Sequence, residues 1–353
     1  MKKTLIALFV SLILISCSNN KNNDSNSANS VSISGAGATF PLPFYNLAIK
    51  NYVKKHGVLV TYGGIGSGGG IRSLKDRVVD FGATDAFLSE EKEKAMPAEI
   101  IHIPTCIGAV VIAYNIPGIE NLKLSNKNLE DIFMGKIKNW NDAELKTSNP
   151  GINLPDKNIT VVHRSDGSGT TFIFSDYMSK ISKEWKEKVG RGKSLKWPVG
   201  IGAKGNPGVA GTIKQNIGSI GYVGSEFAFA QKISFAKIQN SSGKFIDPNL
   251  SSISAAAKGS IPENTKVMLT NSSDTSAYPI SGFTWLILYK EQNYNNRSKK
   301  QAEETVKFIS WLVDKEAQTL AQQVHYAPLP DKAVLQAKKL LQNVVYNNTK
   351  ILK

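Results

Sequence analysis

Residues 164–171 (RSDGSGTT) place a fixed cation, hydroxyl groups and glycines within one short run. Guanidinium, hydroxyl and exposed backbone amide groups all donate hydrogen bonds, so this run is suited to holding an oxyanion. The apolar residues 159–162 before it predict a buried strand, and the apolar spacing over 172–178 favours a helix after it. Ser168 and Thr170 would then lie at a helix N-terminus, where unpaired amides and the helix dipole attract an anion.

The same succession of strand, glycines, hydroxyl residue and helix recurs twice nearer the N-terminus. The apolar run 31–33 leads into residues 35–41 (GAGATFP), and the run 58–62 leads into residues 63–70 (GGIGSGGG). One glycine-rich loop is commonly no more than a turn or a helix cap. Its recurrence favours a binding role that the three loops share.

A fourth predicted strand, within residues 78–85, ends in an acidic residue. Asp85 could cap the helix expected over 89–96, although Ser89 lies nearer to the helix start. Ligands of open α/β sheets bind beyond the carboxyl ends of the strands. Four side chains that follow predicted strands are therefore expected to meet at one site: Thr39, Ser67, Asp85 and Ser168.

Strands and helices alternate along the chain, which predicts an α/β fold with mostly parallel sheets flanked by helices. Helices are expected near residues 42–54, 70–78, 302–324 and 331–345. Two long apolar runs predict strands that cross between two lobes, at residues 106–114 and 282–289. The crossovers divide the chain into lobe I, residues 31–112 and 283–353, and lobe II, residues 113–282.

The composition of the 353 residues is that of a globular protein, with 41% hydrophobic and 20% charged residues. Basic residues outnumber acidic ones by 43 to 28, which gives a formal net charge of +15. The lysines are scattered and form no basic arm with interleaved aromatic residues, so nucleic-acid binding is not expected. We interpret the charge as favouring solubility and weak attraction of anions.

The N-terminal residues predict export and a lipid anchor. Residues 1–16 combine basic residues with an apolar run too short to be a convincing membrane span, as in a secretory signal peptide. Residues 14–17 (LISC) resemble the lipobox of bacterial lipoproteins, in which the cysteine, here Cys17, carries lipid. Residues 17–30 are polar and predict a flexible tether. Cys106 is then expected to be a small buried residue without a disulfide partner.

The chain resembles the phosphate-binding proteins of the bacterial high-affinity phosphate ABC transporter. The resemblance runs from about Val31 to about Pro330, and it includes the motifs at residues 35–41, 64–67, 80–85 and 164–170. It implies a two-lobed periplasmic-binding-protein fold of type II whose lobes close on one phosphate. It also implies a lipid-anchored monomer on the extracytoplasmic side of the membrane, which works with permease subunits and needs no cofactor or metal.

The resemblance also implies a role for each residue where the motifs match. Thr39 and Phe40 donate through hydroxyl and amide, Ser67 donates from the second loop, and Asp85 accepts a proton from the ligand. Arg164, Ser168, Gly169 and Thr170 complete the site from the other lobe, and Asp166 braces Arg164. The chain departs from the pattern at Gly68, where many relatives have a second serine. An arginine fork with hydroxyl and amide dipoles is also what a dehydrated phosphate needs.

Two other functions are open to this sequence. The first is an enzyme, such as a phosphate-ester hydrolase, because Ser168 lies near His163 and Asp166 and because residues 64–69 fit G-x-G-x-x-G. Ser168 lacks the G-x-S-x-G elbow, however, and His163 is expected to point away from Arg164 on the strand. The second is a surface lipoprotein of the same fold with a phosphate-sensing or adhesive role. No histidine or cysteine spacing indicates a metal site.

Overall fold

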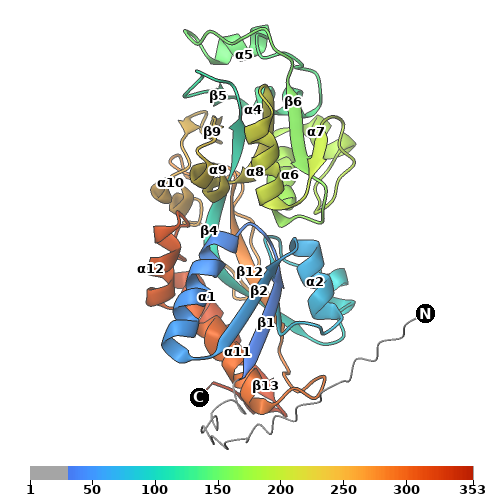
Figure 1. Cartoon of the computed structure of the whole chain (residues 1–353), viewed down its shortest axis with the longest axis vertical. Coiled ribbons are helices and arrows are strands. Elements are labelled where there is room, and N and C mark those ends of the chain that lie inside the picture. Colours follow the sequence, from blue (N-terminus) through green and yellow to red (C-terminus); the bar gives the residue numbers. More distant parts are fainter. Residues whose placement is uncertain (1–30, 353) are drawn as a thin grey trace, which may run out of the picture. The chain divides into compact units, whose positions relative to one another are not determined.

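The computed structural model describes residues 31–352, and its main feature is a sheet of nine strands flanked by helices (Figure 1). The signal peptide over 1–16, the tether over 17–30 and the lipid site at Cys17 lie outside the described residues. They therefore remain predictions from the sequence.

One half of the sheet, here called the first strand set, contains β1, β2, β3 and β12. β1 (Ser32–Gly37) pairs in parallel with β2 (Leu59–Gly64) and with β3 (Phe81–Thr84). β12 (Ser281–Tyr289) runs antiparallel to β3. Because β1, β2 and β3 are parallel, the loops after them leave the sheet at the same edge.

The other half, the second strand set, contains β8, β6 and β7. β8 (Ser219–Gly224) and β7 (Ile201–Ala203) both pair in parallel with β6 (Thr160–Arg164), so their carboxyl ends also share an edge. β4 (Ile100–Tyr114) joins the sets, because its first part pairs with β12 and its last part with β8. Figure 1 shows β4 running from one set to the other.

Helices follow most strands, as the alternation in the sequence predicts. Their bounds are α1 Leu42–His56, α2 Ser67–Lys75, α3 Glu90–Lys94, α4 Asn126–Phe133, α5 Ala143–Ser148, α6 Gly169–Ile181, α7 Lys183–Lys188, α8 Gly205–Gln215, α9 Ser225–Gln231, α10 Leu250–Ala255, α11 Lys299–Leu312, α12 Lys315–Gln323 and α13 Asp331–Leu341. The minor strands are β5 Lys123–Leu124, β9 Ser234–Phe235, β10 Lys237–Gln239, β11 Phe245–Ile246, β13 Val345–Tyr346 and β14 Thr349–Lys350.

The two long apolar runs form the centre of the core. Every residue of β4 and of β12 is buried, which explains why both read as continuous apolar runs and not as alternating ones. Cys106 lies in β4 without exposed surface, as expected, and within residues 31–352 it has no disulfide partner. Among residues 31–352, no helix is long and apolar enough to cross a membrane.

Three predicted helices differ from the structure. The helix expected over 302–324 is two helices, because Asp314 adopts an extended backbone (φ −80°, ψ 158°) between α11 and α12. α2 begins three residues before the expected start at 70 and ends at Lys75, before Val78, which is 69% exposed. The last helix ends at Leu341 and not at 345, where the short strand β13 begins.

Candidate functional site

The loops after β1, β2 and β3 bring four of the residues singled out in the sequence to one edge of the first strand set. Thr39 and Phe40 follow β1, Ser67 begins α2 after β2, and Asp85 follows β3. All four are buried, with at most 4% of their surface exposed. The Asp85 N–H donates to Ser67 Oγ at 3.3 Å, which joins the second and third loops directly.

The loop after β6 brings a second group from the second strand set. Ser168 is the N-cap of α6, and its Oγ accepts from the Thr171 N–H at 3.0 Å. Arg164 ends β6 and forms a two-fold ion pair with Asp166, with Nε–Oδ1 at 2.7 Å and Nη2–Oδ2 at 2.5 Å. Its Nη1 lies 3.4 Å from the Thr170 hydroxyl. The guanidinium is therefore held in a fixed plane near the N-terminus of α6.

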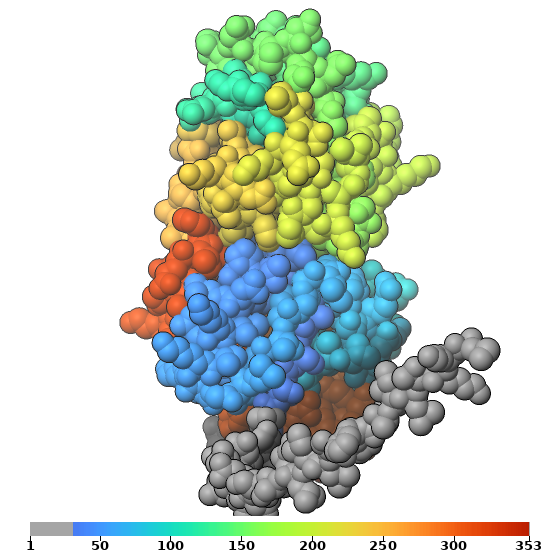
Figure 2. Space-filling model, viewed as in Figure 1, coloured from blue at the N-terminus to red at the C-terminus, as the bar shows by residue number. Residues whose placement is uncertain are grey.

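The two groups face each other in contact. The Gly68 N–H of one donates to the Gly167 carbonyl of the other at 2.8 Å. A Cβ added to Gly169 would lie 2.5 Å from both Asp85 Oδ2 and Ser67 Oγ. On the face shown in Figure 2, the blue surface and the yellow-green surface above it also touch. The residues expected from the sequence thus form one buried cluster, closed against solvent.

Gly68, where the sequence departs from the family pattern, lies at this contact. A Cβ on Gly68 would meet the Gly167 backbone at 3.3–3.4 Å, which is closer than most Cβ contacts. The glycine therefore allows the two loops to approach closely enough for their backbone hydrogen bond.

Asp85 is the acidic member of the cluster, and its surroundings favour its neutral form. Burial raises the pKa of its carboxyl to about 7, against the opposing effects of a hydrogen bond from Thr284 and the charge of Arg164. The Thr284 hydroxyl donates to Oδ1 at 2.7 Å. Asp85 does not cap α3, because Ser89 does so by accepting from the Lys92 N–H. Its Oδ2 faces Ser67 and Gly169 within the cluster.

Three further residues complete the cluster, and the sequence did not single them out. Thr284 comes from the apolar strand β12. Asn206, near the start of α8, contacts both Thr39 and Thr170. Lys193 Nζ donates to the Ala86 carbonyl at 3.1 Å, and the Lys193 carbonyl accepts from the Ser168 backbone N–H at 2.8 Å. Burial, with the nearby charge of Lys92, lowers the pKa of Lys193 to about 8.

The geometry does not support a Ser–His hydrolase. The ring of His163 stacks on Trp197, with centroids 4.7 Å apart, and its Nδ1 lies 3.1 Å from the Arg164 carbonyl. Ser168 Oγ is already the acceptor of the α6 cap. Ser168 therefore has no histidine base in hydrogen-bond reach among these partners. Within residues 31–352, no cluster of three or more histidine, cysteine, aspartate or glutamate residues could hold a metal.

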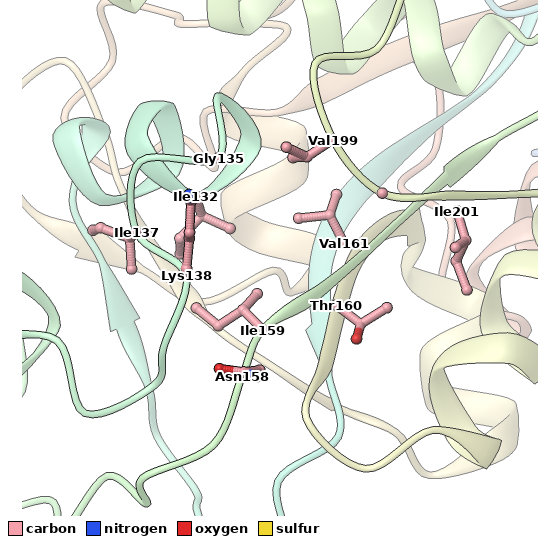
Figure 3. Close-up of a pocket in the computed structure, with 11 residues that line it drawn as sticks. Ile132, Gly135, Ile137, Lys138, Asn158, Ile159, Thr160, Val161, Val199 and Ile201 are labelled. Atoms are coloured by element: carbon pink, nitrogen blue, oxygen red, sulfur yellow. The ribbon is translucent and has the colours of Figure 1, made fainter.

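A cavity of about 460 Å³ lies beside β6, and no residue of the cluster lines it (Figure 3). Its walls are mostly aliphatic and include Ile132, Ile159, Val161 and Val199. Lys138 is the one cationic side chain that lines it. Such a lining lacks the converging donors that an oxyanion requires.

Comparison with known proteins shows the family. Residues 22–316 match the family model described as PBP superfamily domain. The chain is 41% identical over 309 residues to the phosphate-binding protein PstS of Xylella fastidiosa, covering 86% of this chain and 83% of that protein. The chain belongs to the PstS family of phosphate-binding proteins. A second member, from Haemophilus influenzae, is 41% identical over 308 residues, with 86% and 90% covered.

The PstS family membership agrees with the fold of solved structures. The substrate-binding protein of a putative phosphate ABC transporter from Clostridium perfringens, solved with bound phosphate, has a TM-score of 0.62 at 19% identity. The match covers 85% of this chain and all of that one. The expected periplasmic-binding-protein fold is therefore confirmed. Both relatives are named as phosphate-binding proteins.

Proposed function

We propose that this protein binds inorganic phosphate outside the cytoplasm and delivers it to the permease subunits of an ABC transporter for import. The observation that carries the proposal is the buried cluster of donors around Arg164 and Asp85 in a chain of the PstS family. Hydrogen-bond donors from both strand sets converge there, and a dehydrated phosphate needs many such donors. The names of the relatives support the choice of phosphate among oxyanions.

Each member of the cluster has a role in this proposal. The hydroxyls and amides donate to the phosphate oxygens, Arg164 supplies a cation held by Asp166, and Asp85 accepts from the ligand. The residues proposed to contact phosphate are Thr39, Phe40, Ser67, Asp85, Arg164, Ser168, Gly169 and Thr170. The N-terminus of α6 contributes its dipole to the same position.

Asp85 gives the proposed site its selectivity. Inorganic phosphate has a third acidic hydroxyl where a phosphate ester carries its carbon substituent, and it keeps that proton near neutral pH, whereas sulfate is fully ionised. In its carboxylate form, which predominates above its pKa of about 7, Asp85 can accept a hydrogen bond from a protonated phosphate oxygen but meets only a like charge in sulfate. A site built to hydrogen-bond one group rejects analogues without it by about 10⁴-fold.

The test is calorimetric titration of the Asp85→Asn protein with phosphate and with sulfate. Loss of a charged hydrogen bond of about 1.5–3 kcal/mol should weaken phosphate binding by about 10- to 100-fold. Removing the repulsion should bring sulfate to within about tenfold of phosphate. The matched control is Asp76→Asn, because Asp76 is exposed at the end of α2. If Asp85→Asn still ignores sulfate and binds phosphate as before, Asp85 is not the discriminator.

We also propose that phosphate closes the protein. The division into lobe I (31–112 and 283–353) and lobe II (113–282) gives each lobe part of the site, and β4 and β12 would serve as the hinge. A ligand that contacts both lobes favours the form in which they touch. The bond from Gly68 to Gly167 supports this, since it requires the closed arrangement.

The remaining proposals concern the location of the protein and its assembly. We infer that Cys17 carries lipid and holds a monomer at the extracytoplasmic face of the cell membrane, near the permease. This rests on the lipobox-like residues 14–17 and the polar stretch behind them. Lipidation that supplies more than one chain gives stable anchoring, whereas a single chain does not.

A further inference from the structure

Asn206 links three segments through hydrogen bonds that leave no polar atom of its side chain free. It lies just inside α8, after the short strand β7, and has no exposed surface. Its Nδ2 donates to Thr39 Oγ1 at 3.1 Å and to Thr170 Oγ1 at 3.0 Å. Its Oδ1 accepts from the Gly224 N–H at 3.0 Å.

The contact with Gly224 fixes which way the Asn206 amide faces. If the amide were reversed, Nδ2 would face the Gly224 N–H, donor against donor, and Oδ1 would face the two threonines. Only the orientation with Nδ2 toward Thr39 and Thr170 satisfies all the groups. Asn206 therefore acts as a donor toward both threonines.

The bonds that Thr39 accepts determine where its proton can point. Thr39 Oγ1 accepts from the backbone N–H of Asn206 at 3.1 Å as well as from Nδ2. A hydroxyl has two lone pairs and one proton, so both lone pairs of Thr39 are occupied. Its O–H can then only donate, and it must donate to a group other than Asn206.

Thr170 is constrained in the same way from the second strand set. Its Oγ1 accepts from Asn206 Nδ2 at 3.0 Å and lies 3.4 Å from the Arg164 Nη1 donor. Both lone pairs face donors, and the proton is left to point toward the cluster. A serine or threonine hydroxyl can ordinarily donate or accept, and here that choice is removed on both sides of the site.

We propose that Asn206 is a positioning residue that directs the hydroxyl protons of Thr39 and Thr170 toward the bound anion. The inference rests on the proposed function, because it takes these two hydroxyls as ligand donors. Asn206 touches no ligand atom itself. Asn206 orients two hydroxyls, each of which could otherwise donate or accept, as donors before the anion binds. Binding therefore does not have to supply the energy of reorienting them.

The test is a pair of double-mutant cycles on the phosphate dissociation constant, in which Asn206→Leu is combined with Thr39→Val and with Thr170→Val. Asn206→Leu alone should weaken binding by about 10- to 100-fold, because two oriented hydrogen bonds are lost. In either valine background, Asn206→Leu should change the dissociation constant by a factor at least threefold smaller, because one of the hydroxyls that Asn206 orients is absent. An equal loss in all backgrounds would mean that Asn206 supports only the fold.

A second variant keeps the shape of the side chain. Asn206→Asp retains the acceptor for Gly224 but turns the donor toward the threonines into an acceptor, so their protons should point away from the ligand. We expect phosphate binding to fall by at least 100-fold, through the reversed hydroxyl protons and the added negative charge together. Asn216→Asp, at the other end of α8, adds the same charge and should bind normally. Retained binding by Asn206→Asp overturns the inference.

If wild-type protein binds no phosphate, the proposed function itself fails. If wild-type protein binds phosphate and the cycles are additive, only the role of Asn206 fails. The two failures are therefore distinguishable in the same set of titrations.

Discussion

Adding one methyl group at Gly169 should weaken phosphate binding without harming the fold. Gly169 is the first residue of α6, and helix formation there favours alanine over glycine. Its Cα, however, faces the other strand set, where Asp85 and Ser67 lie. Gly169→Ala should therefore leave an open form unaffected and destabilise the closed form.

The structure gives the size of the effect. The new Cβ would lie 2.5 Å from Asp85 Oδ2 and Ser67 Oγ, whereas ordinary contacts are 3.4–4 Å. Relieving the clash requires the two loops to separate by about 1 Å, which stretches the 2.8 Å bond between Gly68 and Gly167 beyond hydrogen-bond range. Overpacking of this kind costs about 1–3 kcal/mol, or about 5- to 150-fold in the dissociation constant.

Titration calorimetry with phosphate and chemical denaturation without it would measure the two effects separately. Gly211→Ala is the matched control, because Gly211 lies within α8 and a Cβ there meets nothing within 4 Å. We expect the control to bind as wild type and Gly169→Ala to be at least fivefold weaker, with an unchanged denaturation midpoint. Wild-type affinity in Gly169→Ala would refute the closed arrangement as the form that binds.

Three further predictions follow from the buried carboxyls, the hinge and the N-terminus. Burial raises the pKa of Glu226 to about 8, so its neutral form stabilises the fold below about pH 4.5 and this stability is lost as the pH rises through 8. In the ligand-free protein, the free energy of unfolding should fall by an amount on the order of 2–5 kcal/mol between pH 5 and 8.5, and Glu226→Gln should reduce this fall. Equal pH profiles of the wild-type and variant proteins would contradict this. Small-angle scattering should give a smaller radius of gyration with phosphate, whereas identical profiles would rule out closure by the ligand. Cys17→Ser should move the protein to the soluble fraction, and a variant that stays on the membrane, with no lipid label on wild type, would exclude the anchor.

The local motifs made part of the site predictable. Thr39, Ser67 and Ser168 each follow a strand within a few glycines, and parallel strands place such loops at one edge. Asp85 was recognisable because an acidic residue follows the strand where the other loops carry donors. In each case the signal lies within about eight neighbouring residues, which is the range over which sequence patterns are informative.

The partners of these residues could not be predicted because they come from distant segments. Thr284 lies within a continuous apolar strand, where nothing marks one threonine as the partner of Asp85. Lys193 is one of many scattered lysines. Asn206 did carry a signal, since residues 201–206 repeat the strand, glycine and helix start of the other loops. The break between α11 and α12 was hidden because apolar spacing continues on both sides of Asp314.

Native mass spectrometry of the purified protein, with phosphate and with sulfate at equal concentration, tests the central claim most directly. We expect one phosphate adduct per chain, no sulfate adduct, and unchanged phosphate on release. Absence of a phosphate adduct at millimolar phosphate, or equal occupancy by sulfate, would contradict the account of this cluster as a phosphate site.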